Sequence, residues 1–547
     1  MSAVPNLDLR PDHWAIVRDA LSRHVPDREV LAFGSRATWT AKDYSDLDLA
    51  IMGEEPLSLR ALSALDEALV ESDLPFRVDI VDWATIDDGF RAIIRRDAVT
   101  VQAPTSVSKW PVGARFENWA TMPFNQAFVV NPAVPIKRGS PTPFVDMAAV
   151  DPSRRAVRSA SIREFRGSGS KFQNGDTLFA RITPCLENGK IARYYANSVL
   201  GDLAHGSTEF IVVRGRLGVT DSEFAFYVAR SDLVREYAIG QMTGTSGRQR
   251  VPTDALAQLD VPLPPLSEQR AIAHVLGTLD DKIESNRRMN GTLEAMARAL
   301  FKSWFVDFDP VRAKMEGRDT GLPDDIADLF PDRIVDSELG EIPQGWKVFR
   351  LDELTHHHTR STSPFRSADL EYEHLSIPAY DAGHHPAVEP GAAIRSNKTV
   401  VPDGAVLLSK LNPRITRVWV PPDSTGRPQV CSTEFLAFTP KSPANRSLLF
   451  ALFSDQHFRA LLKSMVTGTS KSHQRVPPKA LKAQQVMAGS WRLFAVFGEA
   501  TGSMLDRILK NRSEAATLAA LRDTLLPKLI SGEIRVPDAE WVVESVP

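Results

Sequence analysis

Three aspartates in the first hundred residues have the spacing of a metal site. Asp46 and Asp48 lie two positions apart in a strand-like run, so both carboxylates share one face of the strand, where their charges repel unless a cation lies between them. Asp79 lies in a later strand-like run and could complete a Mg2+ site or help activate an attacking hydroxyl. The backbone amides of Gly34 and Ser35 could bind phosphate oxygens. The pattern predicts a site for Mg2+ and a nucleoside triphosphate, in which the three aspartates are metal ligands and catalytic groups.

The order of these residues resembles a known family. Gly34 and Ser35, then ten residues, then Asp46 and Asp48, with a later strand aspartate, are similar to the motif of minimal nucleotidyltransferases of the polymerase-beta superfamily. The resemblance covers residues 1–102 and implies that the aspartates bind metal while Gly34 and Ser35 hold the triphosphate. It leaves the acceptor open, because members modify proteins or nucleic acids, and small stand-alone members often act as antitoxins. The alternative is that the acids are surface groups at strand ends of an inert fold.

Short helices and strands must position these residues. Apolar patterning predicts helices at 12–24 and 57–71, and strands at 29–33, 45–52 and 77–83. Together they indicate a small α/β domain.

The rest of the chain contains two long helices that share one pattern. A mostly apolar heptad seam runs from Ile272 to Trp304 and returns 225 positions later from Phe497 to Leu529. Asn286 recurs as Asn511 inside this seam, where a polar residue lowers stability but can fix register. The two helices are expected to pack as an antiparallel coiled coil, the helix at 267–304 spanning roughly 57 Å. Two ordinary amphipathic core helices are the alternative.

Each long helix follows a loop rich in glycine, threonine and serine, at 244–251 and at 468–476. Small residues allow close approach of the backbone, and arginine and glutamine side chains can reach phosphates or base edges. A solvated turn whose arginine caps a neighbouring helix is the alternative. Arg181 and Lys410 follow matching strand-like runs, which favours a shared role. The predicted DNA-binding residues are Arg181, Thr245, Ser246, Arg248, Gln249, Arg250, Lys410, Thr469, Ser470, Lys471, His473, Gln474 and Arg475.

A second resemblance covers nearly everything after about residue 113. The segments 263–314 and 521–536 are very similar to the specificity subunits of type I restriction-modification systems. The resemblance implies two target recognition domains that each read one half of an asymmetric bipartite site in double-stranded DNA. It also implies that the helices act as a spacer and dock two methyltransferase (M) subunits, through which restriction/translocase (R) subunits join. The start of the second helix, 488–502, departs from the family pattern, which leaves the distal docking surface open.

Motifs that are missing from the sequence indicate that partners perform this chemistry. There is no GxxxxGK[S/T] phosphate loop and no Asn-Pro-Pro-aromatic methylation motif. By the second resemblance, partner subunits would use S-adenosylmethionine for adenine N6 methylation and ATP for restriction. Whether the chain is itself an enzyme depends on the N-terminal domain. The alternative function is a nucleotidyltransferase that modifies a partner, as in antitoxin-like regulation, with the DNA-reading half as a tether.

Length and composition set the remaining limits. The 547 residues are too many for one core, and the net charge of −3 means that any DNA-binding surface must come from local clusters. Cys185 and Cys431 are too few for a disulfide framework. No signal peptide or membrane-spanning run is found, so we expect a cytoplasmic protein without membrane contact. The fold class is α+β multidomain, with a nucleotidyltransferase-like domain (1–102), a linker (103–114), a target recognition domain (115–262), a spacer helix (263–312), a connector (313–340), a second target recognition domain (341–488), a second spacer helix (489–536) and a tail (537–547).

Overall fold

The computed structural model describes residues 6–544 apart from 26–27, 43–44, 54–56, 58, 71, 73, 87, 103–117, 160, 198–200, 246, 338–339, 443 and 467–473. By contacts the chain divides into two compact units. One unit consists of residues 1–152, 156–273 and 527–538, and the other consists of 153–155, 274–526 and 539–547. The division falls within both long helices. Each part is therefore described by itself.

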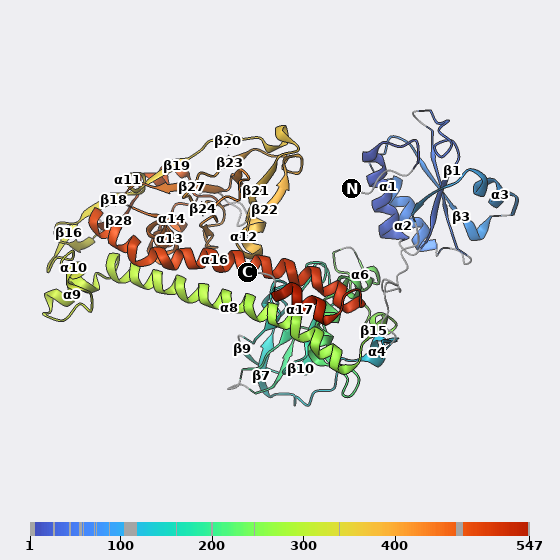
Figure 1. Cartoon of the computed structure of the whole chain (residues 1–547), viewed down its shortest axis with the longest axis horizontal. Coiled ribbons are helices and arrows are strands. Elements are labelled where there is room, and N and C mark those ends of the chain that lie inside the picture. The colour runs from blue at the N-terminus through green and yellow to red at the C-terminus, as the bar shows by residue number, and fades with distance from the viewer. Residues whose placement is uncertain are drawn as a thin grey trace. The chain divides into compact units, whose positions relative to one another are not determined.

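The N-terminal domain is a four-stranded sheet with three helices (Figure 1). The strand order is β3-β2-β1-β4, with β2 parallel to β3 and β1 antiparallel to both β2 and β4. Helix α1 begins with Pro11, whose fixed φ suits a first helical turn, and it buries Val17 and Leu21. The predicted helices and strands are confirmed to within about two residues at most ends. The elements are α1 (Pro11–His24), β1 (Val30–Phe33), β2 (Leu47–Ile51), α2 (Leu59–Val70), β3 (Val78–Asp82), η1 (Trp83–Thr85), α3 (Asp88–Asp97) and β4 (Val99–Gln102).

The first β-domain, residues 120–263, combines a five-stranded sheet (β6-β14-β11-β12-β8) with a four-stranded sheet (β10-β13-β7-β9) and the pair β15-β5. Helix α5 packs on β14 and β11, and its middle six residues are buried. The elements are β5 (Ala120–Pro123), α4 (Phe124–Ala127), β6 (Phe128–Val130), β7 (Pro141–Val145), η2 (Met147–Ala149), β8 (Ala156–Val157), β9 (Ser161–Glu164), β10 (Ser170–Gln173), β11 (Thr177–Ala180), β12 (Ile191–Tyr194), β13 (Leu203–Gly206), β14 (Phe210–Gly215), α5 (Ser222–Arg230), α6 (Asp232–Gly240), α7 (Thr253–Ala257) and β15 (Asp260–Leu263).

The second β-domain, residues 347–489, repeats this plan with the sheets β19-β27-β24-β25 and β20-β23-β26-β21-β22 and the pair β18-β28. Strands β24 and β27 start 229 and 225 positions after β11 and β14. The predicted repeat is therefore present in the fold. The elements are β18 (Lys347–Arg350), α11 (Leu351–Leu354), β19 (Thr355–His358), β20 (Ser361–Thr362), η3 (Pro364–Ser367), β21 (Glu371–Leu375), α12 (Ile377–Gly383), β22 (Ala387–Pro390), η4 (Gly391–Ala393), β23 (Lys398–Val400), β24 (Val406–Ser409), β25 (Val418–Trp419), β26 (Gln429–Cys431), β27 (Phe435–Pro440), α13 (Arg446–Ser454), α14 (Gln456–Ser464), α15 (Pro478–Lys482) and β28 (Gln485–Gly489).

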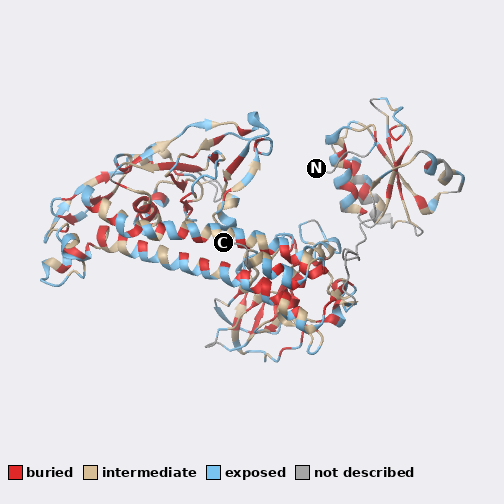
Figure 2. Ribbon diagram, in the orientation of Figure 1, coloured by how far each residue is buried: buried red, intermediate tan, exposed pale blue. Residues whose placement is uncertain are grey.

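The two long helices are α8 (Leu266–Phe305, 40 residues) and α16 (Trp491–Ser531, 41 residues). They lie side by side, and the buried residues on their facing sides follow the predicted seam (Figure 2). Phe301 near the end of α8 contacts Phe497 near the start of α16, whereas Lys282 pairs with Glu514 at 3.3 Å. Residue numbers rise along one helix as they fall along the other, which confirms the antiparallel packing.

Several short elements lie outside the predicted pattern. The segment between α8 and the second β-domain holds α9 (Asp309–Met315), α10 (Asp324–Ala327) and the hairpin of β16 (Ile334–Ser337) and β17 (Gly340–Pro343). The segment predicted as a tail contains the helix α17 (Val536–Glu544). That helix has nine residues and no heptad repeat, so its pattern is too short to be distinctive.

Candidate nucleotide site and candidate nucleic-acid interface

The predicted carboxylates lie at the same end of two neighbouring strands of the N-terminal sheet. Asp48 and Asp79 are register partners across the parallel strands β2 and β3, and Asp46 is exposed just before β2. Gly34 follows β1 and has φ +75°. A Cβ at Gly34 would collide with a carboxylate oxygen of Asp48. Only glycine therefore allows the turn at Gly34 and Ser35 to approach the carboxylate so closely.

The electrostatics at these strand ends favour a cation. Burial raises the pKa of Asp48, and the charges of Asp79 and Asp46 raise it further. Asp79 forms an exposed ion pair with Arg77 at 2.9 Å. Carboxylates of this kind fit Mg2+, and a bound cation would remove the repulsion. The described residues contain no group of three or more His, Cys, Asp or Glu side chains gathered to hold a metal, so the metal-binding and catalytic roles of the three aspartates stay predictions.

Arg36 is a positioning residue that the sequence analysis missed. Its guanidinium is buried and donates through Nε to the carbonyl of Ser45 and through Nη1 to the carbonyl of Asp8, both at 2.9 Å. It also lies over the ring of Phe76, 3.9 Å from the centroid. Arg36 thereby ties the turn at Gly34 to the segment that leads into Asp46. In the sequence, the position of Arg36 directly after Gly34 and Ser35 was the only indication of this role.

In the first β-domain, backbone hydrogen bonds join three segments that are far apart in sequence. The amide of Arg181 donates to the carbonyl of Glu209 at 3.0 Å, and the carbonyl of Arg181 accepts from the amide of Val251 at 2.8 Å. The amide of Thr183 donates to the carbonyl of Gln249 at 3.0 Å, and its hydroxyl accepts from the Gln249 amide at 3.0 Å. The end of the predicted DNA-binding loop is thus fixed beside the strand end at Arg181.

The second β-domain contains the same connections. The amide of Lys410 donates to the carbonyl of Glu434 at 2.9 Å, and the carbonyl of Lys410 accepts from Val476 at 3.0 Å. The amide of Asn412 donates to the carbonyl of Gln474 at 2.9 Å. Arg181 and Lys410 therefore occupy equivalent backbone positions, as their spacing indicated.

Each loop also ends in a paired arginine. Arg250 donates from Nε to both carboxylate oxygens of Glu209 at 3.0 Å, and from Nη2 at 2.8 Å. Arg475 makes the same forked contact with Glu434 at 2.9–3.1 Å. Both arginine side chains remain 45% exposed. The pairing makes them positioning groups for the loops, and the sequence analysis missed the two glutamates as their partners.

The other predicted contact residues divide into three groups. Thr245 and Arg248 are exposed, whereas Gln249 and Gln474 are half-buried. The Nε of the half-buried Arg181 is buried without a hydrogen-bond partner. Ser246, Thr469, Ser470, Lys471 and His473 lie outside the described residues. DNA contact by any of these residues stays a prediction.

Several comparisons with known proteins agree with this geometry. The family described as "Nucleotidyltransferase domain" matches residues 15–103, and the family described as "Type I restriction modification DNA specificity domain" matches residues 171–295. The chain is 52% identical over 102 residues to a probable protein adenylyltransferase, MntA, of Haemophilus influenzae, covering 19% of this chain and 90% of that protein. It is 24% identical over 426 residues to the HindI specificity subunit of the same species, covering 69% and 90%. A 25% identical match over 331 residues to the MjaIX specificity subunit of Methanocaldococcus jannaschii covers 58% and 70%.

Two solved structures are also similar. The HsdS subunit from Thermoanaerobacter tengcongensis is 19% identical, with 78% of this chain and 98% of that chain covered and a TM-score of 0.29. The S subunit from M. genitalium is 14% identical, with 76% and 96% covered and a TM-score of 0.42.

The fold and the sequence matches together define a class: two similar β-domains joined by paired helices, preceded by a small nucleotidyltransferase fold. The chain contains a type I restriction-modification DNA specificity domain and is similar to a type I specificity subunit over 69% of its length, and its first hundred residues are a fused nucleotidyltransferase domain. None of the described helices is both long and apolar enough to cross a membrane.

Proposed function

We propose that the chain recognises an asymmetric bipartite site in double-stranded DNA, with one half-site read by each β-domain. The observation that carries this proposal is the backbone network that recurs around Arg181 and Lys410. The network holds the ends of the two loops, at 249–251 and 474–476, in equivalent positions, while the loops themselves, 244–251 and 468–476, differ in sequence. If the same backbone arrangement presents different side chains in the two β-domains, these side chains would contact different bases. The two halves of the site would therefore differ.

The long helices would set the distance between the half-sites and dock the catalytic partners. Two antiparallel helices of one register present two related surfaces, which fits two methyltransferase subunits. Met289 and Met296 on α8 are 41% and 49% exposed, and apolar side chains on an exposed helix face suit a protein interface. Restriction/translocase subunits would join through the methyltransferases. Those partners would use S-adenosylmethionine for adenine N6 methylation and ATP for restriction.

Single-molecule methylation mapping tests this role. Genomic DNA is compared between cells that hold this chain with its cognate methyltransferase subunit and cells that hold the methyltransferase alone. We expect a split, asymmetric methylated motif only when the chain is present. If the partner is expressed and no chain-dependent motif appears, the proposed role is wrong.

A second function is favoured by the acidic strand ends of the N-terminal domain. The raised pKa of Asp48 beside Asp79 and Asp46 supports a Mg2+ site that carries a nucleoside triphosphate, with the amides of Gly34 and Ser35 on its phosphates. The bound metal would supply charge neutralisation at the phosphates. The chain's own residues would orient the triphosphate so that a hydroxyl of a partner protein takes up the nucleoside monophosphate, with pyrophosphate as the leaving group. Such a modification would regulate the restriction complex in the manner of an antitoxin, with the DNA-reading half as a tether.

Transfer of label from nucleoside triphosphates to the other subunits tests the second function. The purified complex is incubated with Mg2+ and each labelled triphosphate, using the wild type and Asp46→Asn/Asp48→Asn. Asp66→Asn is a matched control, because Asp66 lies exposed on α2. We expect transfer with the wild type and the control and none with the double variant. Equal labelling with all three proteins would show that these carboxylates do not catalyse transfer.

A further inference from the structure

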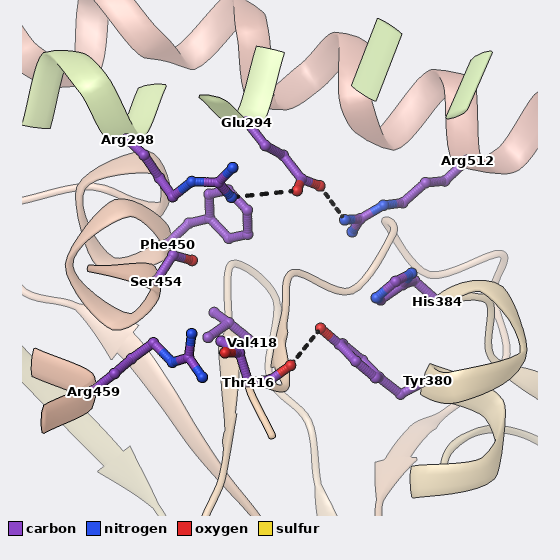
Figure 3. A pocket seen from close by; sticks show the side chains of 10 residues that line it. All are labelled: Glu294, Arg298, Tyr380, His384, Thr416, Val418, Phe450, Ser454, Arg459 and Arg512. Atoms are coloured by element: carbon purple, nitrogen blue, oxygen red, sulfur yellow. Dashed lines mark hydrogen bonds and ion pairs between the residues drawn. The ribbon is translucent and has the colours of Figure 1, made fainter. Parts of the chain in front are cut away.

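A pocket of about 350 Å3 lies between the second β-domain and the adjoining parts of α8 and α16 (Figure 3). Its volume is at the small end of the usual range for small-molecule sites, about 300 to 1,000 Å3. One wall is polar and comes from the long helices, and the other combines aromatic and apolar side chains with a further arginine. The lining residues are Glu294, Arg298, Tyr380, His384, Thr416, Val418, Phe450, Ser454, Arg459 and Arg512.

Positive charge exceeds negative charge in this lining. The lining contains three arginines and one carboxylate, that of Glu294. Glu294 binds Arg512 at 2.9 Å and lies 3.7 Å from Arg298 (Figure 3). In the part of the chain that the structure describes, the side chain of Arg459 donates to a backbone carbonyl, that of Arg414, at 3.3 Å. One carboxylate therefore serves two guanidinium groups, and the third has no anionic partner among the lining residues.

Two donors of the lining arginines are buried and have no hydrogen-bond partner among the described residues. They are Nε of Arg459 and Nη1 of Arg512. Buried charged donors are nearly always paired, because desolvation without a partner is strongly unfavourable. The two groups belong to helices on opposite walls of the pocket, α14 and α16.

The first β-domain shows how the same arginine is satisfied when an acid is present. Helix α14 begins 224 positions after α6, so Arg459 is the counterpart of Arg235. Arg235 donates to Asp232 at 2.8 Å, one helical turn earlier. The position of Asp232 is taken by Gln456 in the second β-domain. The second copy therefore keeps the arginine and lacks its internal carboxylate.

We propose that this pocket binds a phosphate-type oxyanion, held by the guanidinium groups of Arg459 and Arg512 with Arg298 beside them. Guanidinium forks match phosphate oxygens in geometry and charge. The neighbouring side chains of Val418 and Phe450 leave room for the uncharged part of a phosphate ester. His384 contributes no charge near pH 7, because burial and the charge of Arg512 lower its pKa to about 4.

A bound oxyanion would connect the long helices to α14 of the second β-domain. Two sources have this chemistry, a free phosphate or nucleotide and a backbone phosphate of DNA. The pocket shares no residue with the carboxylate site of the N-terminal domain or with the loops 244–251 and 468–476. A failed test of the pocket would therefore leave both proposed functions untouched.

Isothermal titration of the full chain measures the binding. The titrants are inorganic phosphate, AMP and a short DNA duplex, each at ionic strength matched with chloride. The variants are Arg459→Met and Arg512→Met, and the matched control is Arg395→Met, at an exposed arginine of the same domain. Circular dichroism and gel filtration verify folding. Arg459→Met and Arg298→Met carry the test if Arg512→Met does not fold.

We expect phosphate and AMP to bind the wild type and the control, and each pocket substitution to weaken binding about tenfold or more, since a charge-assisted hydrogen bond is lost. If only the duplex binds and the pocket variants alone weaken it, the ligand is a backbone phosphate of DNA. The proposal is overturned if none of the three titrants binds in the millimolar range. It is equally overturned if the pocket variants and Arg395→Met have the same effect.

Discussion

Replacing the buried ion pair of the spacer by apolar residues should leave the helix pair intact, whereas removing one partner should destabilise it. Asp280 on α8 and Arg522 on α16 lie 2.6 Å apart, and their side chains are only 4% and 5% exposed. Arg522 also binds Asp523 at 2.7 Å, but that carboxylate is 60% exposed. The perturbations are Arg522→Ala, Asp280→Leu and the double substitution.

The chain itself indicates the expected magnitudes. Along the 225-residue repeat, Asp280 corresponds to Leu505 and Arg522 to Ala297, and both counterparts are buried (4% and 5% exposed). An apolar pair thus occupies the equivalent place in the other half of the seam. Removing one charge breaks the buried ion pair and leaves the other charge buried, which costs about 3 to 5 kcal/mol. Replacing both is expected to be neutral or to stabilise by about 1 to 4 kcal/mol.

Native-state hydrogen exchange of the α8 and α16 amides is the appropriate assay, because a chain of several domains has no single unfolding free energy. Protection should fall in each single variant and return to the wild-type level or above in the double variant. The wild type, the two single variants and the double variant form a double-mutant cycle, which also gives the coupling energy between Asp280 and Arg522. The reasoning is refuted if the double variant loses as much protection as the worse single variant.

Three further predictions concern other buried polar groups. Ala515→Asn should stabilise the spacer by about 0.5 to 1.5 kcal/mol in hydrogen exchange. Nδ2 of Asn286 is buried without a partner among the described residues, and Ala515 is the repeat counterpart of the Asn290 that binds Asn511. Unchanged protection of the α8 and α16 amides would contradict this prediction. The folded-state pKa of His384 is lowered to about 4, so the stability of the second β-domain should fall by about 3 kcal/mol as the pH drops from 6.5 to 4. In hydrogen exchange measured over this pH range, His384→Phe should abolish the loss of stability. The control His385→Asn, at an exposed neighbour, should keep it. Burial and like charges raise the folded-state pKa of Asp48, so its ionisation destabilises the N-terminal domain as the pH rises. In calorimetry at neutral pH, Asp48→Asn should raise the thermal midpoint of that domain while weakening Mg2+ binding. A lower midpoint would contradict a destabilising charge at Asp48.

Long periodic segments were predictable because each turn repeats the same signal. The ends of α8 and the sequence pattern agree to within one residue, since ten seam positions define one face. Strand pairing was not predictable in the same way. Strand β11 pairs with β14, more than thirty residues later, and a local pattern does not encode a partner at that distance. The repeat showed which strands correspond between the halves but not which strands are neighbours.

The same difference between local signals and distant pairings applies to the candidate sites. Gly34, Ser35 and the aspartates were found from residue type and spacing, which are local. Glu209 was missed as the partner of Arg250, because the two are 41 residues apart and each is unremarkable alone. A signal was nevertheless present, since both motifs recur at one offset of 225. An acid and a base that repeat together are candidates for a conserved pair in the fold.

The polar residues of the seam give the spacer a single register. The side chain of Asn511 donates to Asn290 at 2.9 Å. Along the 225-residue repeat, Asn511 corresponds to Asn286 and Asn290 to Ala515, so the seam is not symmetric in sequence. A slip by one heptad would bury Arg522 without Asp280 and separate the two asparagines, which is far less favourable than losing apolar contacts that any heptad replaces. Such a slip is about 10 Å of helix, or about three base pairs of duplex. A purely apolar seam would be more stable but would tolerate several registers of the two helices. Under the proposed function, the polar residues therefore lower the stability of the seam and fix the spacing between the half-sites.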